Sequence, residues 1–158
     1  MGWWIRISIV IVACATTAAA NAGPLDQFAG RWAGWGRLSL AGGNTEKLKC
    51  VTTYRVKSGG LSADQNFRCA SAGYRFDAVV TLKVSSNKVS GEWRERIFSA
   101  GGPLSGTLKS GNMRLRLRSE TFVAGVDVKS RRCTQSIVIK PRGGDIDIQS
   151  ISVSLKRC

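Results

Sequence analysis

The 158-residue sequence predicts an all-β protein, a single antiparallel up-and-down barrel of about eight to ten strands. Short segments alternate apolar and polar residues, as strands with one buried and one wet face do. No stretch repeats its apolar residues at helical spacing. The alternating runs, broken by Gly, Ser and Asn, recur every ten or so residues. The turn signals between them include, in chain order, AGGN, KSGG, SSNK, SAGG, KSGN and PRGG.

The alternation places the strands between these turns. We expect them, in chain order, at residues 31–40, 47–57, 65–72, 74–84, 87–98, 103–109, 113–118, 121–128, 133–140 and 146–156. The clearest is MRLRLR, in which Met113, Leu115 and Leu117 should point inward while the intervening arginines point outward. No linker or internal repeat divides the chain, so residues 23–158 are expected to form one domain.

The first expected strand lies within FAGRWAGWGRLSL and interleaves the largest and the smallest side chains. Its even positions should face inward, so Trp32 is expected to close one end of the barrel. Gly34 and Gly36 would leave room for its ring. Trp35 falls on the outer face, where it could join a recognition patch or be covered by residues 23–29.

The alternation changes phase twice, which favours a curved, closed sheet over a flat sandwich. The apolar positions are odd-numbered at 113–117 and even-numbered at 122–128. They switch again between Ile148 and Ile151. We expect a β-bulge near residues 119–120 and another near 149–150, because an extra residue restores pairing while bending the strand.

The N-terminal residues 1–22 have the pattern of a signal peptide. Arg6 precedes an apolar run that is too short to span a bilayer, and Ala20-Asn21-Ala22 fits a cleavage site before Gly23. In the alternative interpretation, Cys14 is the anchored cysteine of a bacterial lipoprotein. Either way the protein should be exported to the periplasm or beyond.

Four cysteines remain after such a leader, and an even number in an exported chain indicates disulfides. We favour the pairs Cys50–Cys69 and Cys133–Cys158, because each joins strands close in sequence. Without histidine or a CxxC motif, a metal site is not expected. The same lack of histidine excludes Ser-His-Asp and Cys-His catalysis, and no carboxylate pair is spaced for glycosidase chemistry. We therefore expect no enzyme, no catalytic residue and no cofactor.

The start of the domain resembles the calycin barrels, the lipocalins and avidins. FAGRW, with Phe28, Gly30 and Trp32, is similar to their G-x-W motif. The resemblance implies that Trp32 closes the barrel floor and that a basic residue of the last strand, Arg157 or Lys156, packs on it. It also implies a barrel that binds a ligand.

Two further resemblances concern longer stretches. The chain is similar to a group of uncharacterised exported bacterial proteins at Cys69-Ala70-Ser71, Trp93-Arg94-Glu95 and Gly102–Gly106, which implies no activity. The order AGRW, Cys50, Cys69 is similar to that of periplasmic inhibitors of secreted metalloproteases. That resemblance implies an inhibitory N-terminal tail, here Gly23–Gln27.

The leading functional hypothesis is a binding protein that holds a small apolar or amphipathic ligand inside the barrel. Its candidate ligand-binding residues are Trp32, Tyr54, Tyr74, Phe76, Trp93 and Glu95. The aromatic residues could instead be core packing. Glu95 would be the polar anchor, or it would lie at the barrel mouth or pair with an arginine such as Arg157.

A second hypothesis follows from the net charge of +14. Arginines on two expected outer faces could bind anionic lipid or polysaccharide of the cell envelope, or could form an ordinary solvated surface. These arginines are Arg94, Arg96, Arg114, Arg116 and Arg118. No nucleic-acid partner is expected, because stacking aromatic strands are not evident. The oligomeric state stays open.

Overall fold

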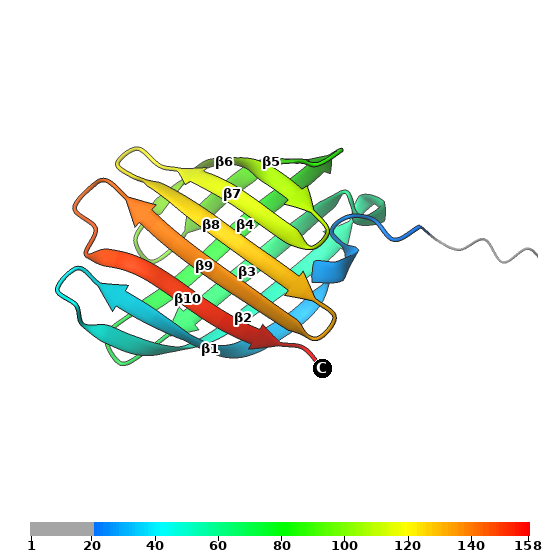
Figure 1. Ribbon diagram of the computed structural model, residues 1–158. Helices are drawn as coiled ribbons and strands as arrows, with labels where there is room; N and C mark the ends of the chain where they lie inside the picture. Colours follow the sequence, from blue (N-terminus) through cyan, green and yellow to red (C-terminus); the bar gives the residue numbers. More distant parts are fainter. Residues whose placement is uncertain (1–20) are drawn as a thin grey trace, which may run out of the picture.

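The protein is a closed barrel of ten antiparallel strands, each bonded to its neighbours in sequence, with the first strand bonded to the last (Figure 1). The computed structural model describes residues 21–158; most of the predicted leader, including Cys14, lies outside the described residues. The closed antiparallel barrel confirms the predicted fold class. Within the described range, no helix has the length and apolarity needed to cross a membrane.

All ten predicted strands are present, with ends shifted by a few residues. Their bounds are β1 Gly30–Leu40, β2 Thr45–Lys57, β3 Ser62–Ala70, β4 Arg75–Ser85, β5 Lys88–Glu95, β6 Ala100–Lys109, β7 Asn112–Arg118, β8 Val123–Arg131, β9 Thr134–Arg142 and β10 Ile148–Lys156. Two short 3-10 helices, η1 (Asp26–Phe28) and η2 (Ser58–Gly60), lie at one end of the barrel. On β7, Met113 and Leu115 are buried and the arginines between them are exposed, as the alternation predicts.

One of the two predicted bulges is confirmed and the other is wrong. Leu40 pairs with Ile148 and Ser39 with Ser150, so Gln149 is the extra residue that shifts the register of β10. The phase change near residue 119 comes from a turn instead. There the Ser119 N–H donates to the Phe122 carbonyl oxygen at 2.9 Å, and the chain reverses between β7 and β8.

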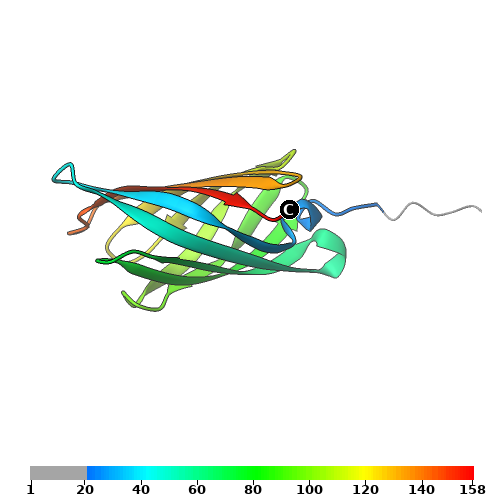
Figure 2. The same cartoon turned by 90° about the horizontal axis from the view of Figure 1, so that it is seen from below.

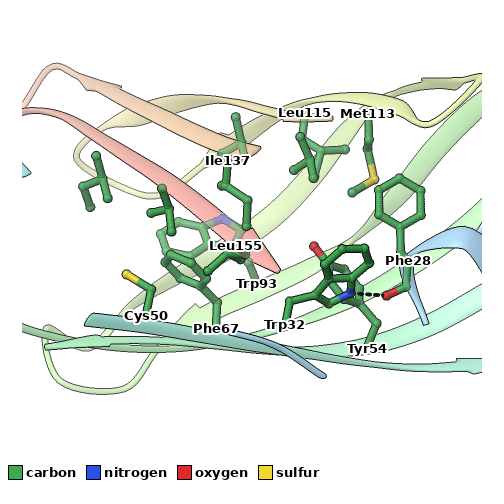
Figure 3. Packing of buried hydrophobic residues seen from close by; sticks show 14 of the residues in the cluster. Phe28, Trp32, Cys50, Tyr54, Phe67, Trp93, Met113, Leu115, Ile137 and Leu155 are labelled. Carbon is green, nitrogen blue, oxygen red and sulfur yellow. Dashed lines mark hydrogen bonds between the residues drawn. The ribbon is translucent and has the colours of Figure 1, made fainter. Parts of the chain in front are cut away.

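One end of the barrel is closed by a packed group of side chains that we call the floor: Leu25, Phe28 and Trp32, all with no exposed surface. The Trp32 indole N–H donates to the Phe28 carbonyl oxygen at 2.8 Å (Figure 3). The Arg157 guanidinium lies over the Trp32 ring, 4.4 Å from its centroid. The structure therefore confirms Trp32 as the closing residue and selects Arg157 as its basic partner.

The glycines that follow Trp32 have a different role from the predicted one. A side chain at Gly34 would collide with the Ser154 carbonyl oxygen, and one at Gly36 would lie 2.8 Å from the Ser152 carbonyl oxygen. The missing side chains therefore allow the backbone of β10 to approach β1 closely, where the barrel closes. They do not clear space for the Trp32 ring.

Both predicted disulfides are present. Cys50 and Cys69 are directly opposite each other on β2 and β3, with Cα atoms 4.1 Å apart, and both are buried. Cys133 and Cys158 join the turn before β9 to the C-terminus, and both are exposed. The first bridge therefore lies in the core and the second fastens a chain end.

Candidate ligand cavity

A cavity of about 380 Å³ opens at the end of the barrel opposite the floor. Residues of the turns after β3, β5, β7 and β9 surround its opening, which we call the mouth. Its aromatic lining consists of Phe67, Tyr74, Phe76, Trp93, Phe98 and Phe122. Small and aliphatic residues complete the wall, among them Ala78, Ala100, Leu117, Ala124, Ile139, Ile148 and Ile151.

The aromatic lining forms two groups. Tyr74 and Phe76 stack with ring centroids 6.3 Å apart, and Phe98 packs on Phe76 at 5.9 Å. Trp93 packs on Phe122 at 5.8 Å, and its indole N–H donates to the Arg118 carbonyl oxygen at 3.1 Å. The hydrogen bond fixes the plane of the indole, so Trp93 presents a rigid apolar face to the cavity.

Glu95, the last residue of β5, lines the same cavity but is held by the backbone. One carboxylate oxygen accepts the Asp77 N–H at 2.6 Å, and the other accepts the Phe98 N–H at 2.6 Å. The predicted pairing with Arg157 is wrong, because Arg157 packs on the floor at the opposite end. Glu95 lies at the mouth, where it fixes the turn that carries Phe98.

Three features of the mouth were missed from the sequence. Phe98 is 56% exposed yet reaches the cavity. Ile97 is 51% exposed and lies on the outer side, although alternation through the strand expected at residues 87–98 would put it on the inner side with Trp93 and Glu95. The cause is that β5 ends at Glu95, so both residues belong to a turn and lose the period-two pattern. Ile146 also lines the cavity, between the exposed residues Asp145 and Asp147.

The structure divides the six predicted ligand-binding residues between the two ends of the barrel. Tyr74, Phe76, Trp93 and Glu95 line the cavity. Trp32 and Tyr54 do not, because they pack with Phe28, whose ring centroid lies 5.7 Å from that of Tyr54 (Figure 3).

Tyr54 belongs to a buried polar network near the floor. Its hydroxyl accepts a hydrogen bond from the Gln65 amide nitrogen at 3.0 Å and donates to the Gln135 side-chain oxygen at 3.4 Å. Burial raises the pKa of the Tyr54 phenol well above its ordinary value of 10.0, and its side-chain hydrogen bonds only partly oppose that effect.

This raised pKa predicts a loss of stability in alkali. The folded state keeps Tyr54 protonated while the unfolded chain ionises above about pH 10, so its contribution is full below that pH and declines above it. The expected loss is about 1.4 kcal/mol per pH unit above 10, relative to Tyr54→Phe. Urea titrations of both proteins across this range measure it, and parallel curves would contradict the assignment.

The predicted polyanion-binding arginines are all exposed, and they lie in two groups separated by one strand. Arg114, Arg116 and Arg118 follow each other along β7, whereas Arg94 is on β5 and Arg96 in the turn after it, with β6 between. Asp127 lies 3.5 Å from Arg114, and Asp77 lies 3.5 Å from Arg96.

Residues 23–27, predicted as an inhibitory tail, are folded onto the barrel. The Gly23 N–H donates to an Asp26 carboxylate oxygen at 2.6 Å, and the Leu25 N–H donates to the Gly60 carbonyl oxygen at 3.0 Å. Leu25 is part of the floor, so this segment is not a free tail. It also does not cover Trp35, which is 54% exposed beneath the Lys47 ammonium.

Comparisons with known proteins show a similar fold in a solved structure. No protein-family model matches the chain, and no curated protein matches it in sequence. Among solved structures, the barrel is similar to the S-type phycobiliprotein lyase CPES from Guillardia theta, with a TM-score of 0.60 over 83% of this chain and 86% of that one. The two sequences are 8% identical, so the likeness shows the fold alone. It fits the calycin-like barrel that the G-x-W motif predicts.

Proposed function

We propose that this protein is a binding protein that holds a small apolar or amphipathic ligand in the cavity at the barrel mouth, without changing it chemically. The observation that carries the proposal is the cavity of about 380 Å³ with its almost wholly apolar lining. Protein interiors are normally packed without such spaces, and ligand pockets commonly have volumes of about 300–1,000 Å³.

The arrangement of polar groups favours a ligand with one polar end. The wall is apolar along its strands, whereas Asp145 and Asp147 stand at the mouth. An apolar body would lie against Trp93 and Phe122, with its polar end at the mouth beside water. Phe98, largely exposed at the opening, provides an apolar surface that a ligand would meet first.

The structural neighbour gives limited support. It has a barrel of this architecture and is named as a lyase for phycobiliproteins. A function directed at another molecule is therefore compatible with this type of barrel. The extracytoplasmic location that the leader predicts is part of this proposal.

Filling the cavity tests the proposal. Ala124 is buried in the wall, so Ala124→Phe should occupy ligand space and weaken binding of the fluorescent probe N-phenylnaphthylamine by about tenfold or more. Ala33→Phe adds the same group on the outer side of β1 and should bind as the unaltered protein does. Fluorescence titration measures both, with circular dichroism melting to verify folding.

Two results would refute the proposal. One is the absence of probe binding to the unaltered protein, and the other is equal binding by both variants, which would place the probe outside the cavity. Native mass spectrometry of protein purified from its own cells supplies an independent measurement. A retained mass that Ala124→Phe abolishes identifies the ligand.

A further inference from the structure

A second hollow, of about 950 Å³, lies on the outer surface of the barrel across β1 to β4. It lies on the side where β1 and β2 are in front in Figure 2. The bottom of this hollow carries short side chains from β2 and β3: Val51, Thr53 and Asn66. Thr53 and Asn66 are directly opposite each other, next to Arg31 on β1.

Long basic side chains surround these short ones. We call the hollow the basic groove; its five basic residues are Arg31, Lys49, Arg55, Arg68 and Arg75. Of the lining residues that the structure describes, Asp77 alone is acidic, and it already contacts Arg68 at 3.3 Å and Arg96 at 3.5 Å. Within residues 21–158, the other four groove cations have no carboxylate within 4.0 Å.

The concave shape of the groove strengthens the electrostatic attraction that its cations exert on an anion. A concave surface lined by one sign of charge concentrates the electrostatic field and raises the local concentration of counter-ions. The arginines of β7 lie outside this hollow. Asp127 is beside one of those three arginines, whereas Asp77 is beside one of the five groove cations. The attraction for an anion should therefore be stronger at the basic groove, although both regions are rich in arginine.

The spacing of the cations suits an extended ligand. Lys49 and Arg55 are six residues apart on one strand, which corresponds to about 20 Å. A single small anion would contact only one or two of these side chains. A linear chain that carries an acidic group on each repeating unit would contact several at once. Arginine forks would bind its carboxylate or sulfate groups through paired hydrogen bonds.

We propose that the basic groove binds a linear acidic polysaccharide. The Thr53 hydroxyl and the Asn66 amide at the bottom of the groove can hydrogen-bond sugar hydroxyls. Among the described lining residues the one aromatic is Phe76, which is 8% exposed, so the lining itself offers no open ring for stacking nucleic-acid bases. The exposed Trp35 lies beside the groove, opposite Lys49, so the test of the proposal includes a nucleic acid. This proposal is independent of the ligand cavity.

Two triple variants of equal charge test the proposal. Arg31→Gln, Lys49→Gln and Arg55→Gln together remove three groove cations, and Arg114→Gln, Arg116→Gln and Arg118→Gln remove three from β7. Binding of polygalacturonate and of dextran sulfate is measured by calorimetry over a range of salt. The groove variant should bind about tenfold or more weakly, with a shallower salt dependence, while the β7 variant keeps nearly full affinity.

The possible results separate the alternatives. Binding to either polymer that the groove variant loses supports the proposal, and the preferred polymer shows whether carboxylate or sulfate is recognised. Equal losses in the two variants would show that net charge alone attracts the polymer, and would overturn it. So would tighter binding to phosphatidylglycerol vesicles or to single-stranded oligodeoxythymidine. All six residues are exposed, so both variants should melt like the unaltered protein.

Discussion

Replacing Trp32 by alanine should lower the free energy of unfolding by about 3–5 kcal/mol, the range typical of a large aromatic side chain removed from a core. Trp32 has no exposed surface. Its loss would leave a hole in the floor beside Phe28, leave the Phe28 carbonyl oxygen without the indole donor, and remove the ring beneath Arg157. Urea unfolding followed by circular dichroism measures the change.

Trp35→Ala is the matched control, because it removes the same type of side chain from the outer face of the same strand, three positions further along. Trp35 is 54% exposed and contacts the Lys47 ammonium, so its removal should change stability by no more than about 0.5–1 kcal/mol. If the two variants unfolded alike, Trp32 would not be the residue on which closure of the floor depends.

Removing the buried disulfide, by Cys50→Ala with Cys69→Ala, should lower the free energy of unfolding by about 3 kcal/mol. The two cysteines are 19 residues apart, and the bridge restricts the unfolded chain over that loop. The variant also loses two sulfur atoms from the core, since Cys50 has no exposed surface and Cys69 is 3% exposed. Urea unfolding under non-reducing conditions measures the loss.

The second disulfide serves as an internal comparison. Cys133 and Cys158 are exposed, so a mild reductant should open their bridge first and leave Cys50–Cys69 intact. Alkylation of free thiols followed by peptide mass spectrometry gives the order. Earlier modification of Cys50 or Cys69 would show that the β2–β3 hairpin opens more readily than its burial implies.

The sequence was sufficient for most of the fold because alternation is a local signal. The alternation within each strand predicts which of its faces is buried. MRLRLR therefore predicts that Met113 points inward, whatever the neighbouring strands are. The bulge at Gln149 was predictable for the same reason, as a break in a local pattern. Trp32 could be placed at the floor because the resemblance to calycin barrels supplied its position.

The two candidate sites depend on contacts between distant segments, which alternation does not report. Trp32 and Trp93 both face inward, but only the stagger of the strands puts one in the floor and the other in the cavity. The alternation could not place Phe98 at the cavity, because β5 ends three residues earlier than predicted and Phe98 lies in the following turn. The basic groove combines residues of four strands, and the register of those strands decides which cations lie side by side. The sequence of any one segment therefore cannot predict it.

The first described residues and Cys158 leave the barrel from the same end, beside the floor (Figures 1 and 2). An attachment made at the first described residues or at Cys158 would therefore lie at the floor end, opposite the mouth. Immobilisation on a sensor chip through an added terminal tag should accordingly leave access to the cavity unobstructed.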